Sequence, residues 1–493
     1  MGSYSDTIPK YQVDMHINNK SDVIIVGAGS GGLSVGLFLA KVGIKVTMIV
    51  KRDKDVGGEC LNDGCIPSKA LIHVARQMHA ARQAQAFGIN LHGEIDIQKV
   101  IGYVHARQEI IRKHENVSWL SDQGINVVLG EASFAGKHEV SVNGEIFSAK
   151  KIILATGSKP RKLKVEGVDL VNYLDNESIF LIKQIPKRLL VVGGGPIGIE
   201  IAQALQRLGT EVTVIEEGNR ILVHDDKTLT NILLKRLQEE GIAFHFDVSL
   251  QKFLSPNEAV LKKKNTEEFI LSFDAVFVGI GRVLILEPLQ LEKAGIKIKN
   301  HKIIVDDQLR TTNKDVMVCG DVAGNLQFSH AAEFHGRIIL NNLFSPLNKK
   351  LNNDHMSWVT FTDPEIATFG LNEKELKRRG IKYKKLEQDF SGDDRAVTDN
   401  YQYAEIILYI SKGGVFKKET ILGGTMIAPN AGELIQELIL ANTSGLSINS
   451  IFNKIYPYPV ATRVNQQLIL KHKQNVITSG LKKLLHIAFK IFS

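Results

Sequence analysis

Two glycine-rich turns, each expected between an apolar strand and a helix, constrain the fold of this 493-residue chain more than any other feature. The first has the sequence GAGSGG at residues 27–32. Gly27 permits the tight turn, Gly29 lets the backbone approach a pyrophosphate, and Gly32 allows the helix to pack closely on the strand. The elements expected around this turn are a strand at 22–26, a helix at 33–42 and a strand at 45–50. Because a diphosphate binds well at a helix N-terminus, the pattern predicts a dinucleotide site.

The second turn, GGGPIG at residues 193–198, repeats this arrangement. Its three glycine positions are Gly193, Gly195 and Gly198, between a strand expected at 189–192, a helix reaching residue 208 and a strand at 211–215. Glu216 then ends the second strand, where its carboxylate can accept hydrogen bonds from both ribose hydroxyls and would repel a 2′-phosphate. The second site is therefore expected to prefer NADH over NADPH; the alternative is a glutamate that only faces solvent. The repeated order of strand, turn and helix predicts an α/β chain with parallel sheets and helices on both faces.

Cys60 and Cys65 are separated by four residues at the start of another expected helix. Such a pair can form a small redox disulfide, and the helix N-terminus would favour one thiolate. The alternatives are a zinc site or two buried thiols. A structural zinc needs four ligands, and only His73 and His79 lie near the pair in the sequence. Since Cys319 is the only other cysteine, the pair indicates redox chemistry in a reducing compartment and no metal site.

The composition is that of a globular protein, with 44% hydrophobic and 23% charged residues. The length allows about two to four domains. A net charge of +8 could indicate nucleic-acid binding, but the charges are dispersed and dinucleotides are themselves anionic, so no nucleic-acid partner is expected. Residues 23–44 are apolar, but their glycines divide them into strand, turn and helix, which argues against a membrane span.

The string GGECLNDGCIPSK at 57–69 resembles the active-site segment of the flavin-dependent pyridine nucleotide-disulfide oxidoreductases, the family of dihydrolipoamide dehydrogenase, glutathione reductase and mercuric reductase. Further strings that resemble the family follow in its order: ILATGSKP at 153–160, GIGR at 279–282, VMVCGDV at 316–322, TFTDPEIA at 360–367 and ILGGTMIA at 421–428. The resemblance runs from about Asp22 to about Gln467, and it is strongest to the mercuric reductase-like and dihydrolipoamide dehydrogenase-like branch.

The resemblance implies two Rossmann-like dinucleotide-binding domains, for FAD and NAD, and a C-terminal α/β domain that forms a homodimer. The implied parts are an N-terminal extension at 1–21, the FAD domain at 22–158, the NAD domain at 159–285, a return to the FAD domain at 286–354, the interface domain at 355–470 and a basic amphipathic tail at 471–493.

In this family the flavin accepts hydride from the nicotinamide and passes the electrons to a disulfide. The resemblance implies that Cys65 is the inner thiol beside the flavin and that Cys60 is the outer thiol that exchanges with substrate. It also implies a Lys69–Glu200 pair close to the flavin. Further cofactor contacts are implied for Gly58, Lys69, Ala155, Thr156, Gly157, Gly281 and Asp321.

The chain departs from the family at several functional positions. Val50, followed by Lys51, stands where an acidic residue holds the adenosine ribose of the first dinucleotide. The disulfide reductases supply a base through His-Pro-Thr-x-x-Glu, and here Tyr458 and Arg463 replace the histidine and the glutamate. Tyrosine titrates near pH 10, so Tyr458 is expected to be a poor base and efficient lipoamide or glutathione turnover is not expected. The C-terminal cysteine pair of mercuric reductases is absent, because the last cysteine is Cys319.

The two ends of the chain carry different signals. Residues 1–20 are polar with mixed charges and resemble neither a signal nor a transit peptide, so a cytoplasmic protein is expected. In the tail, one helical face carries Leu481, Leu484, Leu485, Ala488, Phe489 and Phe492, while Lys482, Lys483, His486 and Lys490 lie elsewhere. The tail is expected to form a short helix that either docks on the protein or attaches peripherally to an anionic inner membrane surface.

The sequence therefore predicts a dimeric FAD enzyme that passes electrons from NADH through the Cys60–Cys65 disulfide to a small acceptor. The acceptor could be a disulfide, a soft metal ion or a quinone. Two alternatives stay open, a dihydrolipoamide dehydrogenase proper and a flavin-containing binding or scaffold protein with little turnover.

Overall fold

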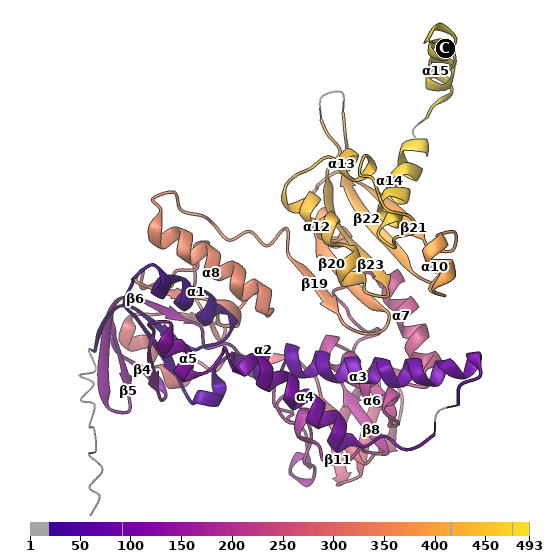
Figure 1. Ribbon diagram of the computed structural model, residues 1–493. Coiled ribbons are helices and arrows are strands. Elements are labelled where there is room, and N and C mark those ends of the chain that lie inside the picture. Colours follow the sequence, from indigo (N-terminus) through magenta and orange to yellow (C-terminus); the bar gives the residue numbers. More distant parts are fainter. Residues whose placement is uncertain (1–18, 91, 415–416, 476, 493) are drawn as a thin grey trace, which may run out of the picture. The chain divides into compact units, whose positions relative to one another are not determined.

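The computed structural model describes residues 19–90, 92–414, 417–475 and 477–492, which form two compact units (Figure 1). Unit 1 comprises the described residues up to Gly58, with His114–Gly157 and Leu284–Lys349. Unit 2 comprises Glu59–Lys113, Ser158–Val283 and the described residues from Lys350 onward. Most of the expected N-terminal extension lies outside the described residues.

Unit 1 is built on a seven-stranded sheet with the path β3-β2-β1-β6-β5-β4, in which β18 also pairs with β6. Its strands are β1 (Lys20–Val26), β2 (Val46–Val50), β3 (Asn126–Leu129), β4 (Ala132–Gly136), β5 (Glu139–Val142), β6 (Glu145–Leu154) and β18 (Val316–Val318). The strands β1, β2, β3, β6 and β18 pair in parallel, while β4, β5 and β6 form antiparallel hairpins. Ile24 and Ile25 of β1 are fully buried, as expected for a strand covered on both faces.

The helices α1 (Ser30–Lys41) and α8 (Ser329–Phe344) pack against each other beside this sheet (Figure 1). Their close approach depends on glycine, since a Cβ atom on Gly336 would lie 2.6 Å from the Oγ atom of Ser34. The other elements of unit 1 are α5 (Val117–Asp122), β16 (Ile298–Lys299), β17 (Lys302–Ile303) and the 3-10 turns η1 (Asp53–Asp55), η5 (Glu287–Leu289), η6 (Leu291–Ala294) and η7 (Gly320–Ala323).

The first part of unit 2 contains a four-stranded parallel sheet, a three-stranded antiparallel sheet and a two-stranded pair. The parallel sheet has the order β10 (Ala243–Phe246), β9 (Glu211–Glu216), β8 (Arg188–Val192) and β14 (Ala275–Val278). The antiparallel sheet consists of β11 (Val248–Ser255), β12 (Glu258–Lys263) and β13 (Glu268–Ser272), and the pair consists of β7 (Lys159–Pro160) and β15 (Arg282–Val283). The helices are α2 (Gly58–Asn62), α3 (Cys65–Gln83), α4 (Ile97–Arg112), α6 (Pro196–Arg207) and α7 (Lys227–Glu239), with short turns η2 (Ala84–Phe87), η3 (Val168–Leu170) and η4 (Ile179–Leu181).

The C-terminal part of unit 2 is a five-stranded antiparallel sheet in which β23 is the central strand. Its order is β19 (Ser357–Thr360), β20 (Glu365–Gly370), β23 (Ile421–Ala428), β22 (Glu405–Ser411) and β21 (Tyr383–Asp389). The helices here are α9 (Glu373–Arg378), α10 (Asp394–Thr398), α11 (Ala431–Leu434), α12 (Gln436–Thr443), α13 (Ile448–Phe452), α14 (Arg463–Asn475) and α15 (Ser479–Phe492). One apolar core cluster joins α3, α4, α6 and α7 to residues of this sheet, so the helix that begins at Cys65 is part of a continuous core.

The two strand-turn-helix units lie where the sequence predicts them, with small shifts at their ends. Helix α1 begins at Ser30, three residues earlier than expected, because Gly31 and Gly32 already belong to its first turn. The predicted parallel pairing is confirmed for the two dinucleotide-type sheets, whereas the remaining sheets are antiparallel. None of the helices among the described residues is both long and apolar enough to span a bilayer.

Candidate functional site

The first glycine-rich turn, in unit 1, has the geometry that a dinucleotide needs. Gly27 has a φ of +106°, and a Cβ atom there would lie 2.3 Å from the carbonyl oxygen of Ala155. A Cβ atom on Gly32 would lie 2.0 Å from the carbonyl oxygen of Gly27. Gly29 is the N-cap of α1 and leaves backbone N–H groups directed outward at that helix end, with no capping side chain among the described residues. These residues fit the diphosphate of a bound FAD.

The segment that leads into the cysteine pair packs directly on this turn. The backbone N–H of Gly57 donates to the carbonyl oxygen of Ala28 at 2.9 Å. A Cβ atom on Gly58 would lie 2.5 Å from the Cα atom of Gly29. Both Gly57 and Gly58 have positive φ angles, so only glycine suits this contact. The sequence identified Gly58 as a cofactor residue by resemblance but did not reveal that Gly57 binds the first turn.

The turn after β6 carries three of the expected cofactor residues. The N–H of Ala155 donates to the carbonyl oxygen of Val26 at 2.8 Å, which places Ala155 beside the first glycine-rich turn. Thr156 follows it, and Gly157 has a φ of +69°. Val50, the last residue of β2, is buried, so this side chain offers no polar group to an adenosine ribose.

Asp321 lies in η7 and follows two residues, Cys319 and Gly320, that contact α8 in the protein interior. The N–H of Gly320 donates to Nδ1 of the buried His335 at 3.1 Å, and the Cys319 Sγ atom contacts the carbonyl oxygen of Ala332 at 3.3 Å. Burial raises the pKa of Cys319 to about 12 and lowers the pKa of His335 to about 4, so both are neutral at physiological pH. Cys319 is therefore a packing residue, and η7 is held in a fixed position.

In unit 2, the two cysteines lie on consecutive helices. Cys60 is half-buried in α2, and Cys65 is exposed as the first residue of the 19-residue helix α3. A helix N-terminus carries a partial positive charge, which favours a thiolate at Cys65. The turn between the helices is tight, because a Cβ atom on Gly64 would lie 2.9 Å from the carbonyl oxygen of Glu59. Among the described residues, no group of three or more His, Cys, Asp or Glu side chains is placed to hold a metal ion.

The structure brings Lys69 and Glu200 together. Lys69 Nζ donates to Glu200 Oε2 at 2.9 Å, and the glutamate is almost completely buried on α6. Phe361, which the sequence analysis did not single out, completes this arrangement. Its backbone N–H donates to Glu200 Oε1 at 2.8 Å, and its ring centre lies 4.4 Å from Lys69 Nζ. Both carboxylate oxygens of Glu200 thus accept a hydrogen bond, and the ammonium group of Lys69 contacts both this carboxylate and the face of the Phe361 ring.

The second glycine-rich turn has the same close approaches as the first. Gly193 has a φ of +110°, and a Cβ atom on Gly198 would lie 2.2 Å from the carbonyl oxygen of Gly193. Gly195 is the N-cap of α6 and has open space around it, as has Gly281, whose φ is +95°. The turn fits the diphosphate of a second dinucleotide.

Glu216 lies at the end of β9 with its carboxylate fixed by the backbone. The N–H of Gly194 donates to Oε2 at 2.6 Å, and the N–H of Gly218 donates to Oε1 at 2.7 Å. Each oxygen retains a lone pair for a further donor. The carboxylate is therefore preorganised beside the second turn, in the position from which a ribose hydroxyl would be recognised.

Tyr458 is exposed, and its surroundings oppose a role as a base. Its hydroxyl donates to Asp394 Oδ2 at 3.1 Å, and the guanidinium of Arg463 lies 5.3 Å from its ring centre. The hydrogen bond to Asp394, together with the negative charge of that carboxylate, raises the pKa of Tyr458 above its usual value. At neutral pH this phenol is protonated and cannot accept a proton.

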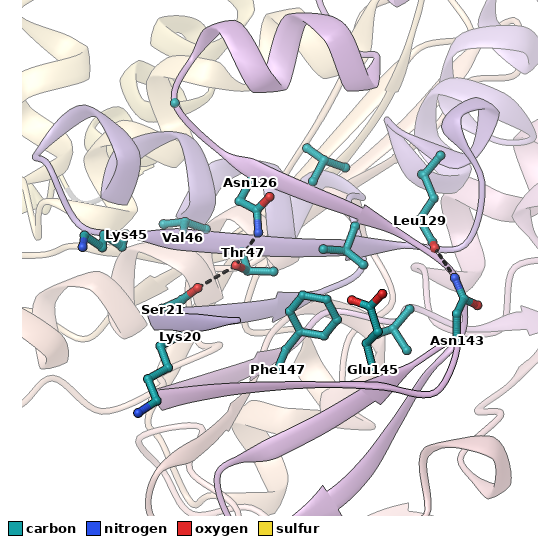
Figure 2. A pocket seen from close by; sticks show the side chains of 14 residues that line it. Lys20, Ser21, Lys45, Val46, Thr47, Asn126, Leu129, Asn143, Glu145 and Phe147 are labelled. Atoms are coloured by element: carbon teal, nitrogen blue, oxygen red, sulfur yellow. Dashed lines mark hydrogen bonds between the residues drawn. The ribbon is translucent and has the colours of Figure 1, made fainter. Parts of the chain in front are cut away.

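A separate pocket of about 590 Å³ opens in unit 1 at the amino ends of β1 and β2 (Figure 2). Ser21 and Thr47 share a hydrogen bond of 2.6 Å there, and the side-chain amide of Asn126 donates to Thr47 Oγ1 at 3.0 Å. Dinucleotides bind at the carboxyl ends of parallel strands, whereas this pocket lies at the opposite ends. The pocket is therefore not part of the dinucleotide site.

The predicted site residues fall into two sets. Unit 1 holds Gly27, Gly29, Gly32, Gly58, Ala155, Thr156, Gly157 and Asp321. Unit 2 holds Cys60, Cys65, Lys69, Gly193, Gly195, Gly198, Glu200, Glu216, Gly281 and Tyr458. Within unit 2, the hydrogen bond between Lys69 and Glu200 fixes the mutual position of these two predicted catalytic residues.

Comparison with known proteins identifies the family. Residues 21–336 match the family model described as pyridine nucleotide-disulphide oxidoreductase, and residues 356–468 match the dimerisation domain of that family. The chain is 33% identical to a dihydrolipoyl dehydrogenase of Thermus scotoductus over 447 residues, covering 89% of this chain and 94% of that protein. It is 30% identical to a mercuric reductase of Bacillus cereus over 457 residues, covering 91% of this chain and 71% of that protein.

The fold is also that of a solved structure, the HOCl-induced flavoprotein disulfide reductase RclA from Escherichia coli. The TM-score is 0.80 at 23% sequence identity, with 91% of this chain and 99% of that chain covered. The dimerisation domain indicates a homodimer. The chain thus belongs to the pyridine nucleotide-disulphide oxidoreductases, a family of FAD-dependent enzymes that use NAD(P)H.

Proposed function

We propose that this enzyme passes electrons from NADH to the Cys60–Cys65 disulfide and from there to a small acceptor. When bound, FAD supplies the chemistry that accepts a hydride and reduces the disulfide. The observation that carries the proposal is the position of Cys65 at the N-terminus of α3. This helix packs into the core of unit 2 and also carries Lys69, which is paired with Glu200. Such a helix end stabilises a thiolate at Cys65, and the partial exposure of Cys60 leaves that thiol within reach of an acceptor.

Among acceptors, we propose one that needs no protein base. Tyr458 is held protonated by Asp394, and Arg463 stands where a carboxylate would orient a base. Thiol–disulfide exchange needs a group that alternately accepts and donates a proton near neutral pH, and a phenol held protonated by Asp394 does not cycle in this range. Disulfide acceptors are therefore disfavoured relative to a soft metal ion bound by the dithiol or to a quinone, which is reduced at the flavin and takes up its two protons without this side chain. RclA has been solved as a Cu(II) complex, which supports copper as one candidate among the soft metals.

The test is steady-state NADH oxidation with lipoamide, glutathione disulfide, Hg²⁺, Cu²⁺ and a soluble quinone in turn. Each acceptor is offered to the unaltered enzyme and to Cys60→Ser. An acceptor that uses the dithiol loses its turnover in Cys60→Ser, whereas one reduced at the flavin keeps it. If even an artificial dye elicits no NADH oxidation, the protein is a flavin-containing binding protein and the proposal is wrong.

We further propose that NADH is the preferred nucleotide, because the Glu216 carboxylate, held by two backbone N–H groups at the end of β9, would repel a 2′-phosphate. Glu216→Arg is expected to shift the ratio of kcat/KM values for NADH and NADPH toward NADPH by about 5–150-fold, the equivalent of about 1–3 kcal/mol for a hydrogen bond to a charged group. Glu217→Arg is the matched control, since it adds the same charge one residue later, and it should produce a much smaller shift. An unaltered enzyme that uses NADPH better than NADH would contradict this assignment.

The C-terminal helix supports a peripheral membrane contact. All residues of α15 are at least partly exposed, including Leu484, Phe489 and Phe492, and its charged side chains are lysines. An exposed apolar face flanked by lysines is typical of helices that lie in the interface of anionic bilayers. We propose this contact for the tail, where it would bring the enzyme close to lipid-soluble acceptors.

The full chain is therefore expected to sediment with vesicles containing anionic lipid and to be released by high salt. A chain truncated after Asn475 should remain in the supernatant while its dye reductase activity is retained. Phe489→Asp places a charge among the apolar side chains of α15 and should weaken sedimentation with the vesicles. Asn475→Asp, which lies outside α15, is the control and should sediment like the full chain. Equal sedimentation of full-length and truncated chains would show that α15 does not mediate the contact.

A further inference from the structure

The residue before the first cysteine is held by a mostly buried arginine from a distant part of the chain. Both terminal nitrogens of Arg282 donate to the two carboxylate oxygens of Glu59, one to each. Arg282 also donates to Ser158, from Nε to the hydroxyl at 2.7 Å and from Nη2 to the carbonyl oxygen at 2.9 Å. Its side chain is only 11% exposed. The two residues are 223 positions apart in the sequence, so this fork is a tertiary feature of unit 2.

A buried asparagine joins the same arrangement. The Nδ2 group of Asn176 donates to Glu59 Oε1 at 2.8 Å and to the backbone carbonyl of Asp63 at 3.3 Å. Asn176 thereby contacts the segment between the two cysteines as well as the residue before them. The glutamate, the arginine and the asparagine fix the backbone on both sides of Cys60.

Charged side chains of both signs lie around this segment. Glu59 and Asp63 contribute two carboxylates, and Arg282 and Lys159 contribute two cations. Partial burial acts to lower the pKa of Lys159, but its hydrogen bond to Glu177 and the charges of Glu177, Asp63 and Glu59 outweigh burial and raise it.

Arg112, from α4, approaches the same segment by donating to Asn62 Oδ1 at 2.8 Å. A carboxylate beside a thiol disfavours its ionisation, whereas a neighbouring guanidinium favours it.

We propose that the Glu59–Arg282 ion pair sets the reactivity of Cys60, with Arg282 acting as a positioning residue that neutralises the carboxylate next to the exchanging thiol. This inference rests on the proposed function, because it assumes that Cys60 is the thiol that meets the acceptor. Loss of Arg282 removes a positive charge from beside Glu59 and makes the Cys60 thiolate harder to form. Loss of the Glu59 charge removes a negative charge from the residue next to Cys60 and makes the thiolate easier to form.

The experiment measures the rate at which the Cys60 thiolate displaces iodide from iodoacetamide, as a function of pH, by mass spectrometry of the FAD-loaded protein. A Cys65→Ser background leaves Cys60 as the reactive member of the pair. Arg282→Gln is expected to raise the pH midpoint of the reaction by about one unit, which is a roughly tenfold slower rate below the midpoint. Glu59→Gln is expected to lower the midpoint, and the double variant should return close to the parent.

Arg188→Gln is the matched control, because Arg188 forms a comparable fork with Asp274 on the surface of the same unit. It should leave the midpoint unchanged. If Arg282→Gln does not fold, as judged by flavin content and circular dichroism, Glu59→Gln decides the question alone.

Unchanged midpoints in folded Arg282→Gln and Glu59→Gln would overturn the inference and leave the proposed function intact. A Cys60 that iodoacetamide does not modify at any pH in the parent would instead overturn the exchanging role of Cys60, and with it the proposed function.

Discussion

Replacing Cys65 with serine is expected to abolish the long-wavelength absorbance band of NADH-reduced enzyme and to reduce dithiol-dependent turnover by about 10³-fold or more. The band requires a thiolate that donates into an oxidised flavin, and serine cannot supply one. Loss of a group that forms the covalent redox centre removes the reaction path, so the effect on turnover is at the large end of the range for catalytic substitutions. Anaerobic absorption spectra and NADH oxidation rates provide the measurement.

Cys60→Ser is the comparison that separates the two sulfurs. With the outer thiol gone no disulfide can form, so the Cys65 thiolate should produce the band without any reductant. The helix N-terminus at Cys65 supports this difference, because it favours a thiolate there. If the two serine variants behave identically, the assignment of inner and outer cysteine is wrong.

Combining Tyr458→His with Arg463→Glu is expected to raise lipoamide turnover by about 10²–10⁴-fold, the usual contribution of general acid–base catalysis. A histidine can accept a proton at neutral pH, and a glutamate can orient it, whereas Tyr458 is held protonated by Asp394. The pH profile of the double variant should gain a histidine-like limb near pH 6–7 that the parent lacks. Steady-state kinetics with lipoamide across pH 5–9 provides the measurement.

Dye reduction is the internal control for this experiment, because it needs no proton from this position. It should change little in the double variant, and Arg463→Glu alone should raise lipoamide turnover much less than the pair. If the unaltered enzyme already reduces lipoamide as fast as a dihydrolipoamide dehydrogenase, the base lies elsewhere and the interpretation of Tyr458 and Arg463 is wrong.

The strand-turn-helix units could be predicted because their determinants are local. Gly32 and Gly198 are each required by a carbonyl oxygen five residues earlier, that of Gly27 and that of Gly193. The same holds for Glu216, whose partners Gly194 and Gly218 belong to the same strand-turn-helix unit. Local sequence therefore specifies both the fold and the chemistry at these turns.

The rest depends on contacts between distant segments, for which the sequence carries no local signal. The antiparallel sheet of β11, β12 and β13 is an exception, because its consecutive strands pair locally but depart from the expected alternation of strand and helix. The contact of the Phe361 ring with Lys69 joins the residue after β19 to α3. The ion pair of Glu59 with Arg282 joins residues that are 223 positions apart in the sequence. Glu59 precedes Cys60 in the sequence, but its partner Arg282 is identified only in the folded chain.

The most direct test of the account is an anaerobic titration of the FAD-loaded enzyme with NADH, followed by its absorption spectrum. If electrons reach the Cys60–Cys65 disulfide, one equivalent of NADH per flavin should generate the long-wavelength band while most of the absorbance of oxidised flavin remains, and two new thiols should become titratable. If one equivalent instead bleaches the flavin without the band and without new thiols, the disulfide is not in the electron path and the central claim is contradicted.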